Sequence, residues 1–167
     1  MISEERIAPH FKYEIVCTTA DGTERWREDF TNLVTTVGKN DLLDKYFKGA
    51  TYTAAWYCGL ISATGYTTGA DVTDTAASHA GWAEDVAYSE ANRPAVTFGT
   101  AAAGSLATSA ASAFSINGTT TLKGAFVISD NTKSGTTGIL YSAGLFTTGD
   151  RAVLAGDIVN VSITMSA

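Results

Sequence analysis

Short runs of alternating hydrophobic and polar residues recur along the chain and predict a mainly β protein. The first run, residues 10–17, is followed by an Asp-Gly dipeptide at 21–22, which favours a tight hairpin turn. Residues 24–30 then alternate again, although Glu28 falls on the same face as the aromatic residues. We therefore predict an N-terminal hairpin over residues 12–30, with a charged surface that faces solvent.

One segment has the pattern of a helix. Asn40 is suited to the N-cap position, Asp41 to the first turn, and Gly49 to the C-terminal end. These signals predict a short helix over residues 40–48. One face of this helix is apolar and consists of Leu42, Leu43, Tyr46 and Phe47. Because so short a helix needs tertiary packing to be stable, we expect this face to lie on a sheet.

Beyond residue 50 the pattern consists of short β runs separated by clusters of Gly, Asn and Thr, which are typical of turns. The run at residues 54–61 predicts a buried strand. Five further runs lie at residues 95–99, 113–116, 122–129, 139–146 and 157–165. Strands of this length and spacing predict a β-sandwich of the jelly-roll type. In this prediction residues 12–167 form a single domain, preceded by an N-terminal arm at residues 1–11.

Residues 62–81 are rich in Gly, Thr, Ala and Asp, and they show no strong periodicity. They predict a long loop, with a short helical turn near residues 74–79. A loop this long inside a compact domain is usually functional or forms an interface. We expect Gly81 to permit a turn and Trp82 to anchor the loop on the sheet.

Charged residues are distributed unevenly. Residues 1–50 carry 16 charged side chains, whereas residues 51–167 carry only 12 and are built largely from Ala, Thr, Ser and Gly. A neutral, Thr-rich surface suits close packing between subunits, because no buried charge has to be compensated. The alternative is that Thr simply reflects the many strands.

Several classes of protein are disfavoured by the same composition. The net charge of −6 argues against nucleic-acid binding, which needs a basic footprint. No stretch approaches the ~20 apolar residues of a membrane span, and the charged start does not suggest a signal peptide. Cys17 and Cys58 are isolated and lack metal-ligand spacing, so we expect two buried thiols, with no metal and no cofactor.

Two groups of acidic and histidine residues invite a chemical interpretation. His79 with the acidic pair Glu84-Asp85 suggests a general base, but no nucleophile motif accompanies it, so we predict no enzyme; a small hydrolase is the weakest alternative. Five acidic residues lack the spacing of a calcium loop and are expected to form a solvated acidic loop. These are Asp71, Asp74, Glu84, Asp85 and Glu90.

Arg93 is one of only four basic residues after residue 50. It either forms a bidentate Arg–Glu pair that orders the loop around it, with Glu90 as one candidate partner, or belongs to a screened surface pair that contributes little. The three tryptophans suggest a carbohydrate platform, but Trp56 lies in an apolar run and is expected in the core. Trp26, in the charged hairpin, is the best exposed candidate, and its expected role is packing in an interface.

Several runs of residues resemble a family of tailed-phage virion proteins. The longest are Asn32-Leu33-Val34-Thr35-Thr36-Val37-Gly38-Lys39-Asn40-Asp41-Leu42-Leu43, Trp56-Tyr57-Cys58-Gly59-Leu60-Ile61, Ala77-Ser78-His79-Ala80-Gly81-Trp82 and Tyr88-Ser89-Glu90-Ala91-Asn92-Arg93-Pro94, with shorter runs at 122–126, 140–143 and 155–157. The run at 77–82 is the most distinctive. The resemblance covers roughly residues 30–165 as ordered patches, and residues 1–30 match least well.

The better-understood members of this family resemble capsid decoration, or cement, proteins, whose jelly-roll bodies clamp the outside of a phage head. The resemblance implies a structural virion protein on the capsid surface, made in the host cytoplasm, and no catalytic residues. The implied partners are the major capsid protein and neighbouring copies of the chain, as a dimer or trimer. The alternative is a tail or fibre-associated protein that binds a host surface receptor, which would need an exposed aromatic patch in the 62–81 loop.

Assembly of this kind requires interfaces, and we expect the N-terminal arm, Met1–Phe11, to lie on a neighbouring subunit. The candidate interface residues are Ile2, Ile7, Phe11, Trp26, His79, Trp82 and Arg93.

Overall fold

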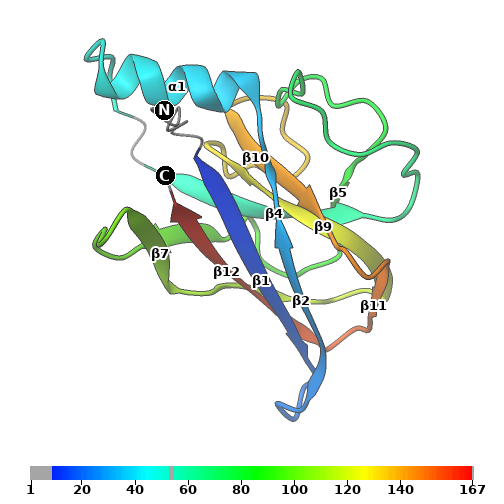
Figure 1. Cartoon of the computed structure of the whole chain (residues 1–167). Helices are drawn as coiled ribbons and strands as arrows, with labels where there is room; N and C mark the ends of the chain where they lie inside the picture. The colour runs from blue at the N-terminus through cyan, green and yellow to red at the C-terminus, as the bar shows by residue number, and fades with distance from the viewer. Residues whose placement is uncertain (1–8, 53–54, 167) are drawn as a thin grey trace, which may run out of the picture.

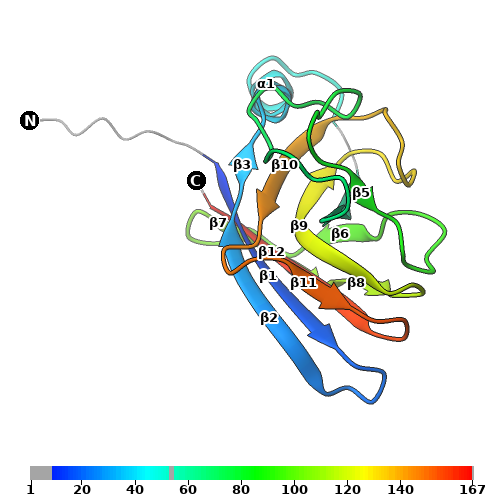
Figure 2. The same cartoon turned by 90° about the vertical axis from the view of Figure 1, so that its right-hand side faces the viewer.

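The computed structural model describes residues 9–52 and 55–166. This part of the chain holds twelve antiparallel strands and one helix, which confirms the prediction of a mainly β, sandwich-like fold. The strands curve around a common core into a nearly closed barrel (Figures 1 and 2). The helix α1 (Thr36–Tyr46) lies across the end of the barrel where β1 begins.

The strands follow one hydrogen-bonded path in the order β2-β1-β12-β7-β6-β4-β9-β10-β3, with β11 and β5 added beside β9 and β4, and β8 beside β12. Their bounds are β1 (His10–Thr18), β2 (Glu24–Thr31), β3 (Leu33–Val34), β4 (Trp56–Ser62), β5 (Glu84–Asp85), β6 (Ala95–Phe98), β7 (Ser105–Ala110), β8 (Ser112–Ser115), β9 (Thr120–Ile128), β10 (Leu140–Leu145), β11 (Arg151–Val153) and β12 (Ile158–Ser166). Because β3 continues from β2 and pairs with β10, the two ends of this path come together and the barrel is nearly closed.

The predicted N-terminal hairpin is confirmed, since β1 and β2 pair from Lys12↔Thr31 to Thr18↔Glu24. The prediction that the hairpin surface faces solvent holds for only one of its two faces. One face of β1 is fully buried in the core, because the alternation that exposes the charged residues turns Tyr13, Ile15 and Cys17 inward.

The boundary of the predicted arm needs a correction. β1 begins at His10 and pairs with β12 from His10↔Ser166 onward, so Phe11 belongs to the sheet and is only 3% exposed. Ile2 and Ile7 lie outside the described residues, and so does most of the predicted arm.

The helix begins earlier than predicted. Thr35, not Asn40, is the N-cap: its hydroxyl accepts a hydrogen bond from the Gly38 N–H at 3.1 Å. The helix packs on β10 through Gly38, where a Cβ atom would lie 2.6 Å from the carbonyl oxygen of Tyr141. Because the bare glycine backbone makes the contact, the helix is rotated so that Leu43, Tyr46 and Phe47 project into solvent, while Leu42 lines a hollow beside the sheet. The expectation that this apolar face packs on a sheet is therefore wrong for Leu43, Tyr46 and Phe47 and only partly right for Leu42.

All six predicted strands after residue 50 are present, each shifted by a few residues. The sequence pattern did not predict β3, β5 and β11, because each has only two or three residues. It did not predict β7 because the sequence SLATSA has little apolar alternation. The long loop after β4 is confirmed, but residues 74–79 form a turn closed by hydrogen bonds between Thr75 and Ser78 and no helical turn.

The buried hydrophobic residues form two clusters, and both cysteines lie in the larger one as unpaired, fully buried thiols, as predicted. Burial raises the pKa of both thiols, that of Cys17 to about 12. Neither thiol is therefore a nucleophile at neutral pH.

The carboxylate of Asp157 links the β1–β2 hairpin to the end of the barrel. Its environment leads us to expect a loss of stability in acid. Its buried carboxylate accepts hydrogen bonds from Arg25 at 3.1 Å and from the Leu154 N–H at 2.9 Å. Burial opposes ionisation, but these hydrogen bonds and the Arg25 charge outweigh it and lower the pKa of Asp157. Its contribution to stability is therefore present above the ordinary pKa of an aspartate, near 3.9, and is lost as the pH falls through the lower folded value.

We expect the free energy of unfolding of Asp157→Asn, measured by urea denaturation from pH 7 to pH 2.5, to fall less steeply in acid than that of the wild type. Asp29→Asn, at an exposed carboxylate, is the control and should retain the wild-type slope. An unchanged acid dependence in Asp157→Asn would contradict this account.

Candidate functional site

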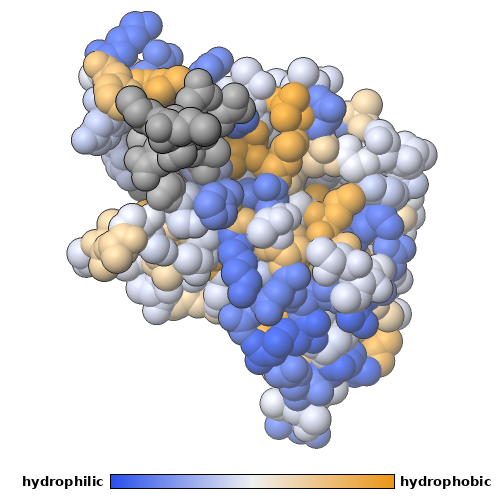
Figure 3. Space-filling model, viewed as in Figure 1, coloured by the Kyte–Doolittle hydropathy of each residue, from blue (hydrophilic) through white to orange (hydrophobic). Residues whose placement is uncertain are grey.

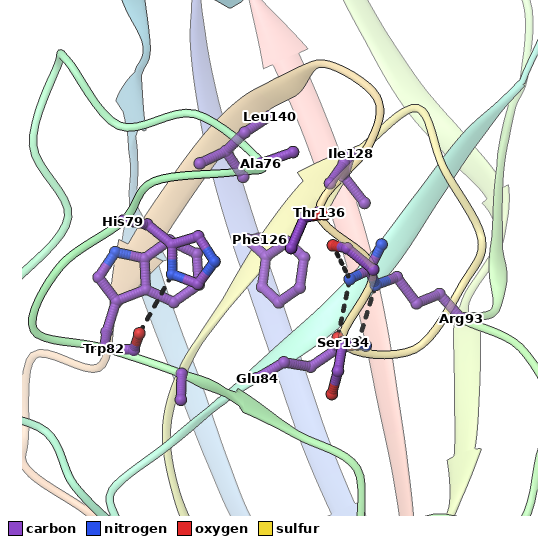
Figure 4. A pocket seen from close by; sticks show the side chains of 12 residues that line it. Ala76, His79, Trp82, Glu84, Arg93, Phe126, Ile128, Ser134, Thr136 and Leu140 are labelled. Carbon is purple, nitrogen blue, oxygen red and sulfur yellow. Dashed lines mark hydrogen bonds and ion pairs between the residues drawn. The ribbon is translucent and has the colours of Figure 1, made fainter.

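Two concave regions on the described surface contain residues that sequence analysis singled out. The first, here called the loop hollow, lies between the 74–83 loop and the 130–138 loop, above β9 and β10 (Figure 4). It encloses about 270 Å³. Its lining residues are Ala76, His79, Trp82, Ala83, Glu84, Arg93, Phe126, Ile128, Ser134, Gly135, Thr136 and Leu140.

Trp82 anchors the long loop, as predicted. Its side chain is only 5% exposed, its indole N–H donates to Asp74 at 2.9 Å, and its ring packs on Phe126 with centroids 5.4 Å apart. The His79 ring also lies against the indole, with ring centroids 4.1 Å apart and an interplanar angle of 30°, and its Nδ1 lies 3.1 Å from the Trp82 carbonyl oxygen. His79 is thus oriented by a backbone carbonyl and not by a carboxylate.

Arg93 forms a buried ion pair, but with Glu84 and not with Glu90. The guanidinium donates from Nε and Nη2 to the two carboxylate oxygens of Glu84 at 2.9 and 2.8 Å, and the two side chains are 3% and 5% exposed. Glu90 instead accepts from the Ser115 N–H. The predicted bidentate Arg–Glu pair is therefore present, but its partner is Glu84 and not Glu90, and the alternative of a screened surface pair is wrong.

The same ion pair holds the 130–138 loop in place. Arg93 also donates to the carbonyl oxygen of Asp130 at 2.8 Å, and Glu84 accepts from the Ser134 N–H at 2.6 Å. The charges are satisfied by protein groups, so they orient the loop rather than await a ligand. The floor of the loop hollow is apolar and aromatic, which suits an apolar side chain or the face of a sugar ring.

The second region surrounds α1. Here an apolar surface, the α1 face, is formed by Leu42, Leu43, Tyr46, Phe47 and Tyr52. Tyr46 and Phe47 are 78% and 77% exposed, and their rings contact each other edge to face at 4.9 Å. Figure 3 shows hydrophobic surface along α1 at the upper left. Exposed aromatic residues gathered in this way mark an interaction surface.

Beside the α1 face lies a groove, here called the α1 groove, formed by two adjoining hollows of about 170 and 240 Å³. Both hollows are lined by Leu42, Leu106 and Met165. Phe11 lines the first hollow, and Pro9, the first described residue, lines the second. The predicted interface residue Phe11 thus contributes to a concave surface while it remains largely buried.

The two remaining tryptophans lie apart from the loop hollow. Trp26 is half-buried against Phe146 with ring centroids 5.8 Å apart, and its indole N–H donates to the Ala152 carbonyl at 3.0 Å. Trp56 is half-buried beside Tyr141 and lines the α1 groove, so its expected full burial is only partly right. The three indoles therefore form no common platform.

Of the candidate interface residues, the structure brings His79, Trp82 and Arg93 together and leaves Phe11 and Trp26 elsewhere. Sequence reasoning missed Glu84 as the partner of Arg93, and it missed Tyr52 altogether. No local spacing identifies either residue, because the contacts of both depend on which loops the barrel brings together.

No protein-family model matches this sequence, and a search of curated proteins found no significant relative. The resemblance to phage virion proteins therefore stays a prediction. Among the described residues, no helix is long and apolar enough to cross a membrane. The described part of the chain also contains no cluster of His, Cys, Asp and Glu that would hold a metal ion.

Proposed function

We propose that this chain is a structural virion protein, a capsid decoration protein that binds the outer surface of a tailed-phage head and stabilises the shell. The observation that carries the proposal is the α1 face. A well-packed domain that exposes Tyr46 and Phe47 by more than three-quarters favours a role in which a protein partner covers them. The major capsid protein and neighbouring copies of the chain are the proposed partners.

Two further features support an assembly role. β7 and the hairpin that leads to it expose mainly Ala, Thr and Ser, which are neutral residues that pack against another subunit without the burial of charge. In addition, the polar groups of the loop hollow are engaged in holding loops, which is a structural task. In the proposed mechanism many modest interfaces, shared between neighbours, resist internal pressure through avidity.

A tail or fibre-associated protein that binds a host receptor is the second candidate. The loop hollow favours it, because an apolar and aromatic hollow of about 270 Å³ has room for part of a small ligand such as a sugar. However, the Trp82 side chain is buried and offers little surface to a ligand. The exposed aromatic residues expected in the 62–81 loop lie instead on α1 and at Tyr52.

Cryo-electron microscopy of virions, or of capsids mixed with the purified chain, tests the proposal. Density for the chain repeated over the outer head surface is the expected result. A bare head with density confined to the tail would overturn the proposal and favour receptor binding, for which a glycan array with the free protein is the next measurement.

The exposure of the α1 face leads to a quantitative prediction of capsid affinity. We expect Leu43→Ser/Phe47→Ser to lower the apparent affinity for capsids at least tenfold, because truncating one aromatic anchor in an interface costs about 2 kcal/mol or more. Co-sedimentation of capsids with increasing amounts of protein measures the effect. The melting temperature should hardly change, because both side chains project into solvent in the free chain.

Val86→Ser is the matched control, since Val86 is an exposed apolar residue away from α1. It should bind capsids like the wild type. Equal binding by Leu43→Ser/Phe47→Ser and the wild type would show that the α1 face does not contribute to attachment.

A further inference from the structure

One hollow of the α1 groove, with a volume of about 170 Å³, is the mouth of the barrel. Seven strands, β1, β4, β6, β7, β9, β10 and β12, each contribute one side chain to its lining, and α1 lies across the same end of the barrel (Figure 1). Among these side chains Phe11, Val127 and Tyr141 also belong to the larger core cluster. The interior of the barrel therefore opens beside α1, and the mouths of β-barrels are common binding sites for small ligands.

Two polar groups in the barrel mouth have no partner. The Tyr141 hydroxyl and the Trp56 indole N–H make no hydrogen bond to another described residue, whereas the indole N–H groups of Trp26 and Trp82 both donate to protein oxygens. Tyr141 is only 6% exposed, yet Asn32 Nδ2 is the one side-chain nitrogen or oxygen that is fully buried without a partner in the described chain. The Tyr141 hydroxyl is therefore accessible, and buried polar side chains of this kind normally have a hydrogen-bond partner.

The charges at the barrel mouth disfavour an anion. Lys45 Nζ lies 2.9 Å from Asp41 Oδ1, and both side chains of this ion pair line the hollow and are mostly buried. Burial and the Asp41 charge raise the pKa of the Tyr141 hydroxyl, so it remains protonated at neutral pH. A ligand anion beside this hydroxyl would be repelled by the same Asp41 carboxylate. The barrel mouth therefore favours a neutral ligand that carries a hydrogen-bonding group.

We propose that the barrel mouth binds a small, neutral aromatic compound of the phenol class. Its ring lies among Phe11, Trp56 and Tyr141, and its hydroxyl bonds to the Tyr141 hydroxyl, with the Trp56 indole N–H as a second donor. The volume suits one ring, since an apolar cavity of about 150 Å³ accommodates benzene. The Trp56 and Tyr141 rings already meet edge to face with centroids 5.1 Å apart, an arrangement that a further ring extends. This binding function is separate from the contact that the α1 face makes with a capsid.

Nuclear magnetic resonance of the isotope-labelled full chain, titrated with p-cresol, tests the site. The indole N–H signals of Trp26, Trp56 and Trp82 are observed separately, and Trp56→Phe assigns its own signal by its loss. We expect the Trp56 signal to shift and to saturate with p-cresol, whereas the other two should stay in place, because their N–H groups are already bonded to protein. Three signals that do not move at millimolar p-cresol would overturn the proposal. A shift confined to Trp82 would place the ligand in the loop hollow and would equally overturn it.

Filling the hollow should abolish binding. Leu106 is half-buried and lines the barrel mouth, so the larger ring of Leu106→Phe occupies the space of the ligand and should weaken p-cresol binding at least tenfold. Leu154→Phe makes the same change at an exposed position after β11 and should bind p-cresol like the wild type. Wild-type affinity in Leu106→Phe would contradict the assignment of the site.

The hydroxyl contact is tested with Tyr141→Phe, which should fold normally because the hydroxyl that it removes has no partner among the described residues. We expect it to bind p-cresol about fivefold more weakly than the wild type and to bind toluene, which has no hydroxyl, equally well. An unchanged affinity for p-cresol would show that Tyr141 does not select a phenol. All these measurements use the free chain, so their failure would leave the proposed decoration role untouched, and a failure to bind capsids would leave this site untouched.

Discussion

Replacing Arg93 with methionine is expected to lower the free energy of unfolding by about 3–5 kcal/mol, because it leaves the Glu84 carboxylate buried without its cation. The substitution also removes the hydrogen bond to the Asp130 carbonyl, so the 130–138 loop loses its attachment to the barrel. Urea denaturation followed by tryptophan fluorescence measures the combined loss of stability.

Two further variants make this test specific. Arg93→Met/Glu84→Leu removes both charges and should be less destabilised than Arg93→Met alone, because no unpaired charge remains. Arg27→Met removes an exposed cation that pairs with Glu24 and should leave stability nearly unchanged. If Arg93→Met proves as mild as Arg27→Met, the buried ion pair does not stabilise the loop.

Gly124→Ala is expected to cost about 3 kcal/mol or more, or to prevent folding. Gly124 lies in β9 opposite β10, where an added Cβ would overlap the carbonyl oxygen of Gly144 and lie 2.9 Å from the Cα of Leu145. Both obstacles are backbone atoms of the paired strand, so they cannot move aside as a flexible side chain would. Thermal unfolding followed by circular dichroism measures the loss.

Gly118→Ala is the matched control. Gly118 lies in the turn before β9, and an added Cβ would meet only the Ala87 Cβ, at an ordinary 3.6 Å. We expect its stability to remain within about 0.5 kcal/mol of the wild type. Equal losses in the two variants would mean that the cost lies in glycine's backbone freedom and not in the contact between β9 and β10.

These two sites differ from the α1 face in what they affect. Gly124 and Arg93 are buried and determine whether the barrel and its loops form, whereas Leu43 and Phe47 are exposed and contribute little to folding of a single chain. Stability and assembly should therefore be separable by mutation. This separation allows the proposed decoration role to be tested with fully folded variants.

Local signals were sufficient for a large part of the fold. Alternation and the Asp-Gly turn predicted the hairpin of β1 and β2, because a two-residue period leaves one face for the core. Apolar runs between turn residues predicted six further strands, and the size of the Trp82 indole predicted that it would anchor its loop. Each of these inferences depends on residues that are near neighbours in the sequence.

The remaining features depend on contacts between distant segments. Arg93 meets Glu84 and the backbone of Asp130 because the barrel brings β5 and two loops together, and an ion pair leaves no periodic trace in the sequence. The spacing of the apolar residues in α1 correctly predicted that they lie on one face of the helix. The orientation of that face depends on Gly38, because the absence of a side chain there allows close contact with the Tyr141 backbone. The hydrophobic pattern thus identifies which residues are apolar. The packing of backbone on backbone determines which of these residues are buried within the chain and which remain exposed for contact with a partner.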